Sequence, residues 1–385
     1  MNFSTHPLWL VGFRPFFALA CLAGASLPLA WVLMFTGSVP SPPTFPVPAL
    51  QWHAHEMFFG FGWAVLGGFL LTSTKNWVGV RGYHGGTLMC LAAAWLFERS
   101  GMVFGGAWPS PLFRLSNVAF IAAIVALLLW TLLRHRAQDI YRDNLYFIVA
   151  LPLFLPAKWM MLDQFQAGWS MSLALFRLTF LIMLERTLTQ FMKGVFQVTL
   201  PRIAPLDHAI KGLALALALG HLLPAWMAAG AALLLALLLF ARWLLWQPHV
   251  ALRRLDIGIM YLGYLALVAQ LLLEFFGLLR GTGWVGTVSV HVFTVGVMGL
   301  IVPAMLIRIS KGHTGRKVTF DTLDRAALWL MLAGFVVRVV APQLQPAAYA
   351  MWMLLAAGCW LACFALLGWR YIPWLLQPRV DGKLH

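Results

Sequence analysis

Charged residues are scarce in this chain. Only 10% of its 385 residues are Asp, Glu, Lys or Arg, whereas 62% are hydrophobic. A soluble domain of this length could not hide so much apolar side chain, so the composition excludes a soluble protein and indicates one that lies in lipid. No hydrophilic stretch is long enough for a separate domain. We therefore expect residues 1–385 to form a single polytopic transmembrane domain.

Cysteine and acidic residues are also few. The four cysteines all lie inside apolar runs, which argues against a disulfide framework, and no Cys-x-x-Cys-His motif is present, so any haem would be non-covalent and b-type. The 12 acidic residues are outnumbered by 27 Lys and Arg, which gives a net charge of +15. These basic residues fall between the apolar runs and are not interleaved with aromatic residues. The pattern indicates membrane orientation, and we expect no nucleic-acid partner.

Long apolar runs predict an all-α membrane protein. Runs of roughly 20 residues are long enough to cross a bilayer. We predict about twelve spans, centred near residues 22, 64, 94, 123, 152, 180, 216, 236, 267, 297, 332 and 359. The seventh and eighth are separated only by "LPAWMAAG". The first run, from Trp9 to about Phe35, is too long for a signal peptide and lacks a basic segment before it, so it is expected to remain as a helix.

The distribution of Lys and Arg predicts the orientation of the spans. The loops after the even-numbered spans, with their flanking turns, hold 19 of the 27 basic residues, whereas the opposite loops hold only four. Because cytoplasmic loops carry the excess of Lys and Arg, both termini are predicted to be cytoplasmic.

This orientation places several ionisable residues near the outer surface. His53, His55 and Glu56 lie in the first turns of the second span, His221 near the outer end of the seventh and His291 about two turns inside the tenth. Such residues at membrane depth usually face a cavity, a partner or a ligand. We therefore predict them as metal ligands; the alternative is that each simply reaches interfacial water.

The "WHAHE" string predicts two neighbouring centres. His53 and His55 are about 200° apart around a helix axis, so one ion could not easily bind both. His53 and Glu56 share a face, where the carboxylate could orient the imidazole or bind the metal. This geometry would suit a haem beside copper or a second haem, since imidazole binds both iron and copper.

A second group of polar residues is predicted at the cytoplasmic side. "IRISKGHTGR" forms a compact cationic turn that could hold haem propionates or a phosphate-bearing lipid, or could simply be a basic loop. Arg14 in "FRPFF" and Arg186 in "LERTLTQF" lie at the same level. Glu185 is expected to pair with Arg14 or Arg177. The predicted clamp for acidic groups is Arg14, Arg186, Arg308, His313 and Arg316.

Several of these strings together resemble the NnrS family. The matching pieces are "FRPFF", "WHAHEMFFGFG", "GFLLTSTKNWVG", "ERTLTQF" and "HVFTVGVMGL" joined to "RISKGHTGR", and they occur in family order over nearly the whole chain. One departure is "MYLGY" around Tyr261, where relatives often carry a histidine in a "LHxGY"-like string. If that histidine is a ligand in relatives, this protein binds metal differently.

The resemblance implies a haem- and copper-containing protein of the bacterial cytoplasmic membrane that acts in nitric oxide metabolism or nitrosative-stress defence. It implies nitric oxide or another small gas as a partner, besides membrane lipid and an electron donor that the sequence does not identify. It supplies no reaction and no catalytic residue. The alternative is a proton-coupled secondary transporter of a small solute, although the polar residues gather near the two surfaces and not at the midplane where a substrate site belongs.

Overall fold

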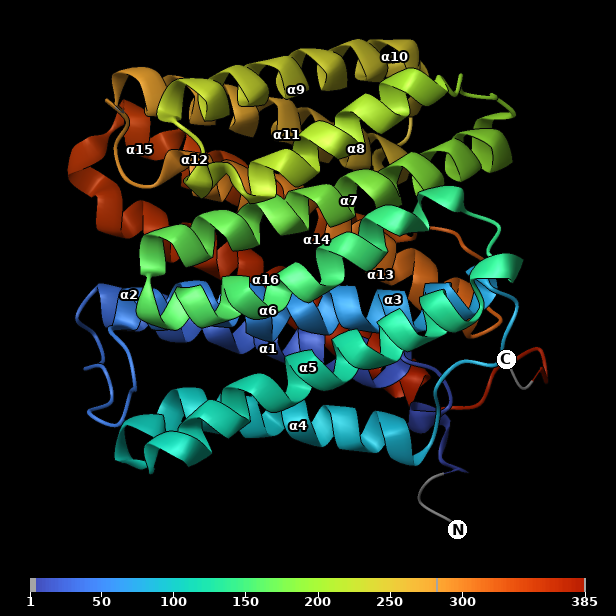
Figure 1. Ribbon diagram of the computed structural model, residues 1–385, viewed down its shortest axis with the longest axis horizontal. Helices are drawn as coiled ribbons and strands as arrows, with labels where there is room; N and C mark the ends of the chain where they lie inside the picture. The colour runs from blue at the N-terminus through green and yellow to red at the C-terminus, as the bar shows by residue number, and fades with distance from the viewer. Residues whose placement is uncertain (1–4, 282, 384–385) are drawn as a thin grey trace. The chain divides into compact units, whose positions relative to one another are not determined.

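The protein was analysed as a computed structural model that describes residues 5–281 and 283–383. Every regular element in these ranges is helical, and eleven helices are long and apolar enough to cross a membrane (Figure 1). The prediction of an all-α membrane protein is thereby confirmed. The chain divides into two compact units, called unit 1 and unit 2. Segments of unit 1 and segments of unit 2 follow one another in turn along the sequence.

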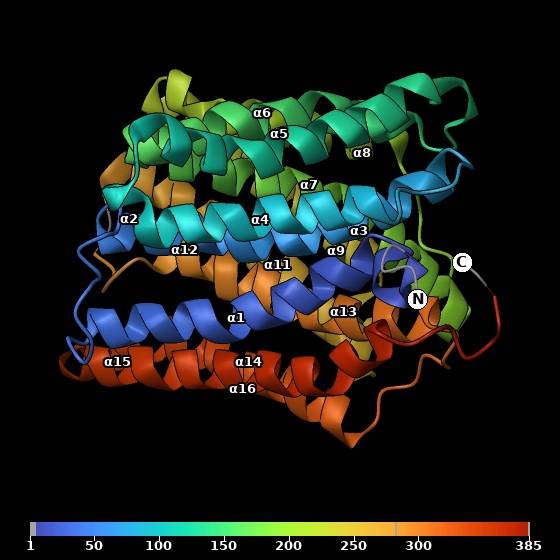
Figure 2. The same cartoon turned by 90° about the horizontal axis from the view of Figure 1, so that it is seen from below.

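Unit 1 comprises the described residues within 1–169, 306–319 and 364–385. In it α1 packs against α3 and η3, α4 packs against α5, and α5 packs against α6 (Figure 2). The second span is built from three consecutive pieces, since α2, the π-helix η3 and α3 follow one another without a break. The bounds are α1 (Phe13–Phe35), α2 (Ala49–His55), η3 (Glu56–Gly62), α3 (Trp63–Trp77), α4 (Gly86–Phe104), α5 (Ser110–Arg134) and α6 (Leu145–Asp163).

Unit 2 comprises residues 170–305 and 320–363. In it α9 packs against α8 and α11, and the π-helix η8 packs against α11 and α14. Helices α7, α13 and α16 contribute residues to both units. The bounds are α7 (Phe165–Phe196), α8 (Ala204–Ala218), α9 (Ala225–Leu245), α10 (Pro248–Ala251), α11 (Leu255–Arg280), α12 (Val288–His291), η8 (Val292–Met298), α13 (Gly299–His313), α14 (Thr322–Val339), α15 (Ala341–Leu344) and α16 (Tyr349–Leu375).

Helix α8 accounts for the difference between twelve predicted spans and eleven long helices. It has 15 residues, which at about 1.5 Å per residue span roughly 22 Å. A hydrocarbon core is about 30 Å thick. Its first half also carries Asp207 and Lys211, both buried. The apolar run around residue 216 therefore forms a helix, but a shorter one than the hydropathy pattern predicts.

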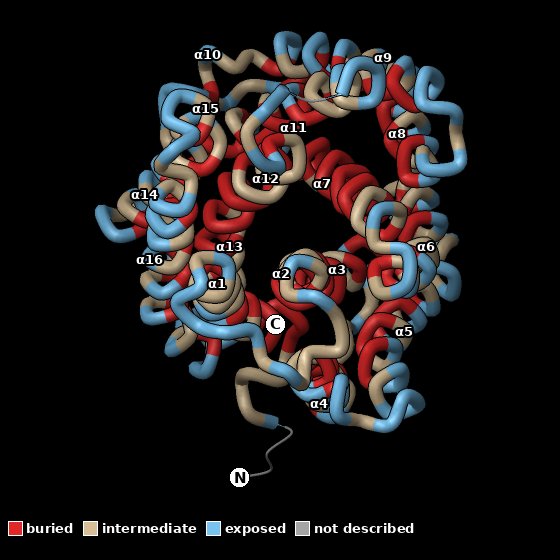
Figure 3. Tube along the Cα trace, turned by 90° about the vertical axis from the view of Figure 1, so that its left-hand side faces the viewer, coloured by how far each residue is buried: buried red, intermediate tan, exposed pale blue. Residues whose placement is uncertain are grey.

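Burial is concentrated in three spans. Residues 49–77, 165–196 and 288–313 are the most buried of the eleven, and Figure 3 shows α3, α7 and α13 in the colour of buried residues along most of their length. Two of these three spans contain the π-helices. They also carry most of the residues that the sequence predicts as ligands.

Candidate functional site

A π-helix begins directly after a predicted ligand histidine in each unit. In unit 1, α2 ends at His55 and η3 follows; in unit 2, α12 ends at His291 and η8 follows. Such π-helical turns are rare and occur frequently at functional sites. In both spans a glycine, Gly60 or Gly296, stands five residues after the histidine. Hydropathy gave no signal for these turns.

A buried network of charges surrounds His55. The His55 Nδ1 lies 3.0 Å from Oε1 of Glu56, and the other oxygen of Glu56 lies 2.9 Å from Nε of Arg99. Arg99 Nη2 donates to Oε1 of Glu98 at 2.5 Å, and the Lys158 ammonium lies 2.5 Å from that same oxygen. Two carboxylates from η3 and α4 thus face two cations from α4 and α6. Their charges balance inside unit 1.

The contact with Glu56 determines which nitrogen of His55 is free. A carboxylate is an acceptor, so Nδ1 carries the proton and donates to Glu56, which leaves the lone pair on Nε2. The His55 side chain is fully buried. Its Nε2 lies 3.8 Å from Oε1 of Glu98, too far for a hydrogen bond, and has no hydrogen-bond partner in the described part of the chain. Metal-ligating histidines usually show this arrangement, with one ring nitrogen held by a carboxylate and the other directed at the metal.

His53 has different neighbours from His55. Its ring stacks on Trp31 of α1, with ring centroids 4.6 Å apart and an interplanar angle of 10°. The two histidines therefore face different surroundings, as the helix geometry predicts. The expected pairing of Glu56 with His53 is wrong, because Glu56 instead contacts His55 and Arg99. A cation on a neighbouring helix draws the carboxylate to that side.

The histidines predicted in unit 2 are less enclosed. The His291 Nδ1 lies 2.8 Å from the carbonyl oxygen of Thr287, and Nη2 of Arg338 lies 3.1 Å from each ring nitrogen. A metal ion at His291 would have to displace this guanidinium. His221 is exposed in the short turn Gly220–Leu222.

The expected partners of Glu185 are wrong. In unit 2 this buried carboxylate pairs with Arg202, lies 2.9 Å from Nζ of Lys211 and lies 3.0 Å from Nη1 of Arg242. Arg177 instead pairs with Glu274, at 2.6 Å. The sequence could not identify these partners, because they come from α8, α9 and the segment before α8, and their proximity depends on helix packing.

Cations gather in unit 1 around the ends of α1, α13 and α16. The buried Arg14 donates to the carbonyl oxygens of Leu375 and Gln377 at 2.8 and 2.7 Å, and its Nε and Nη2 have no hydrogen-bond partner in the described chain. His313 packs against Phe13 and lies near Arg14, Lys75 and Arg379. Arg316 stacks over Trp374 at 4.3 Å.

Asp381 supplies a carboxylate to this cluster. Its hydrogen bond from Arg379, 2.5 Å long, holds the pKa of the Asp381 carboxyl well below its usual range. Among the charged residues placed near His313, cations thus outnumber carboxylates, which suits an anionic ligand. Arg308 also belongs to unit 1 and is buried, whereas Arg186, buried as well, belongs to unit 2.

Three members of the His55 network were not predicted from the sequence. Glu98 and Arg99 stand in "LFERSG", and Lys158 stands in an apolar span, so charge at membrane depth was the signal that could have indicated them. In the described residues, no three His, Cys, Asp or Glu side chains are grouped so that they could hold a metal ion.

The fold and this site define a multi-pass helical membrane protein with buried ionic networks, one of which holds a buried histidine through a carboxylate. Residues 7–379 match the family model described as NnrS protein, and the chain belongs to the NnrS family. A comparison with curated proteins found no match. Membership of this family supports, in general terms, a membrane protein of the nitric oxide response.

Proposed function

We propose that this protein is a haem- and copper-containing protein of the bacterial inner membrane that binds nitric oxide, or another small gas, through histidine-ligated centres. The observation that carries the proposal is His55, whose Nδ1 is held by Glu56 while its buried Nε2, 3.8 Å from Oε1 of Glu98, accepts no hydrogen bond in the described chain. Neutral imidazole in this state is a ligand for iron or copper. A bound haem would supply an iron that binds the gas or passes electrons.

The residues around His55 hold and orient the imidazole. Glu56 holds the proton on Nδ1, and Arg99 pairs with the other oxygen of Glu56 and fixes the position of its carboxyl group. Phe59, with its ring centroid 5.4 Å from that of His55, covers the imidazole on one side. His53 has its own neighbour, Trp31, so we assign the two histidines to separate centres, with His291 as a further ligand and His221 as a weaker one.

The cation cluster in unit 1 fits the propionates of a haem. Arg14 is buried with two guanidinium nitrogens unused, and a carboxylate would satisfy them. Arg316 and His313 lie at the same end of unit 1. We assign Arg14, Arg308, His313 and Arg316 to this role within unit 1, and the predicted role of Arg186, which belongs to unit 2, stays a separate prediction.

The test is the iron, copper and visible spectrum of purified His53→Ala, His55→Ala and His291→Ala proteins. We expect a Soret band that moves on reduction and again with nitric oxide, and a different metal loss in His53→Ala from that in His55→Ala. Arg14→Gln and Arg308→Gln should retain less haem. His249→Ala is the control, because His249 is exposed in the short helix α10. Identical loss of one metal in both variants, or no loss in any, would contradict the assignment; a protein without iron or copper would favour the transporter alternative.

A further inference from the structure

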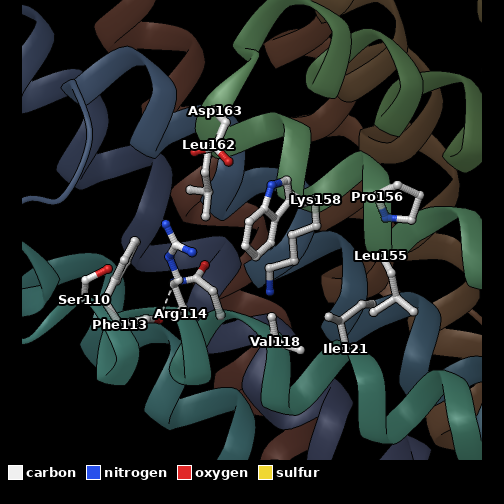
Figure 4. A pocket seen from close by; sticks show the side chains of 12 residues that line it. Ser110, Phe113, Arg114, Val118, Ile121, Leu155, Pro156, Lys158, Leu162 and Asp163 are labelled. Carbon is white, nitrogen blue, oxygen red and sulfur yellow. Dashed lines mark hydrogen bonds between the residues drawn. The ribbon is translucent and has the colours of Figure 1, made fainter.

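A cavity of about 540 Å³ lies between α5 and α6 in unit 1. Figure 4 shows its lining, with Arg114 from α5 and Leu162 and Asp163 from the end of α6 on one side and Ile121 and Leu155 on the other. Its volume is within the usual range for a small-molecule site. The proposed haem and copper ligands do not line it.

The cavity reaches the His55 network through two buried polar side chains. Lys158 lines the cavity and also forms the ion pair with Glu98. Asn117 lines it as well, and its amide lies beside the imidazole of His55. A molecule in this cavity would therefore be separated from His55 only by the side chain of Asn117 or of Lys158.

The hydrogen-bonding groups that face the cavity are of two kinds. The Nδ2 of Asn117 donates to the carbonyl oxygen of Phe113 at 3.3 Å. Its buried Oδ1 has no other hydrogen-bond partner in the described chain than the neighbouring imidazole of His55, so it keeps a lone pair for a ligand. Lys158 offers donors, of which Glu98 takes one. The site thus presents an acceptor and a cationic donor to the same ligand.

The remaining lining is flat and apolar. The guanidinium of Arg114 lies 5.4 Å from the ring centroid of Trp159, so the two helices share a planar wall on which an aromatic ring can stack. Val118 and Trp159 are 39% and 46% exposed on helices that are long enough to span the membrane. An apolar tail could leave the cavity toward lipid between these two side chains.

We infer that this cavity binds the ring of a lipid-soluble hydroxyarene, the chemical class of membrane quinols. The phenolic oxygen accepts from Lys158 and its O–H donates to Oδ1 of Asn117, while the tail extends into the bilayer. A phosphodiester group has no O–H to donate, so it would place negative oxygens against Oδ1 of Asn117. A cationic ligand would meet Arg114 and Lys158.

Binding at this cavity does not depend on the proposed haem or copper. Only the role of the bound molecule as an electron donor rests on the proposed function. Measuring iron, copper and the visible spectrum of every variant beside its ligand binding keeps the two questions separate.

The experiment measures binding of tritiated decylubiquinol to the full-length protein in lipid nanodiscs, with empty nanodiscs subtracted. We expect saturable binding, a Kd raised by about three- to tenfold in Asn117→Leu through loss of one neutral hydrogen bond, and loss of saturable binding in Val118→Trp, which fills the cavity. Val149→Trp is the control, since Val149 is similarly exposed on α6 but does not line the cavity.

Two results would overturn the inference. One is unchanged decylubiquinol binding in Val118→Trp, which would place the quinol elsewhere. The other is saturable binding of tritiated phosphatidic acid that Val118→Trp abolishes, without saturable binding of decylubiquinol, which would make the cavity a lipid headgroup site. Binding is expressed per folded protein, and the metal content of each variant is measured beside it.

Discussion

Glu98 shows how an acidic residue is accommodated inside this membrane protein. Its side chain is fully buried, and its Oε1 receives both Arg99 and Lys158 at 2.5 Å. An isolated charge at this depth would be strongly disfavoured, but a carboxylate held by two cations is compensated. The network also keeps the cation of Lys158 at the cavity and close to His55.

Removing Lys158 should leave Glu98 undercompensated. We expect Lys158→Met to lower the free energy of unfolding by about 3–5 kcal/mol, as for other buried ion pairs that lose one partner. Glu98→Gln in the same chain should recover part of that loss, which a double-mutant cycle in reversible SDS titrations would measure. Lys193→Met is the matched control, since Lys193 is exposed and should change stability little. Equal losses in the single and double variants would show that no coupling exists.

At the scale of single helices, the π-helix η3 places the residues of the His55 network. In η3 the fifth residue after His55 is Gly60, and a Cβ there would lie 2.6 Å from Nη1 of Arg99. Its carbonyl oxygen accepts a hydrogen bond from Nε1 of Trp95 at 3.0 Å. The absence of a side chain thus lets α4 approach η3 closely enough for Arg99 to reach Glu56.

Gly60→Ala should push Arg99 away from the His55 network. Because Glu56 and Glu98 both hold the guanidinium, it cannot move without loss, and we expect a destabilisation of about 1–3 kcal/mol, as for other overpacked sites. Gly230→Ala on α9 is the control. No atom lies within 4 Å of its added Cβ, so it should be neutral or stabilise by about 0.5–1 kcal/mol. Equal stability of both variants in SDS titrations would contradict the role given to Gly60.

At the scale of the whole molecule, α8 decides how the chain crosses the membrane. Eleven long helices alone would leave the termini on opposite sides, whereas a crossing by α8 would return them to the same side. Its 15 residues are short for the bilayer, but the turn after it carries no Lys or Arg and continues the helix by three residues. The charge pattern favours the crossing.

We therefore predict that both termini are cytoplasmic and that α8 crosses. Single cysteines introduced at Thr44 and Leu222 should react with a membrane-impermeant maleimide in intact cells, whereas one at Gln377 should react only after permeabilisation. Labelling is compared in a background without the native cysteines. Reaction at Thr44 and Gln377 from the same side would refute this topology. Protection of Leu222 together with that result would show that α8 does not cross, because eleven crossings leave the termini on opposite sides.

Much of the fold follows from hydropathy, since apolar runs of about 20 residues must form helices in lipid, where every backbone N–H and C=O needs an internal partner. The different surroundings of His53 and His55 also follow from the sequence, because two residues along a helix rotate the side chain by about 200°. Local geometry is sufficient for both. It did not predict the π-helices, because they depend on how neighbouring helices accommodate one extra residue.

The sequence by itself determined the helical membrane class, the family resemblance and the positions of the histidines along their spans. Only the tertiary structure decided that Glu56 contacts His55 and that Glu98, Arg99 and Lys158 lie around this pair. It also decided that Glu185 pairs with Lys211 and Arg242. The physical reason is that hydropathy and helical periodicity act within one element. An ion pair between helices depends on which faces pack together, and residues 26 to 57 positions apart, as for Glu185 with Lys211 and Arg242, carry no local signal of that contact.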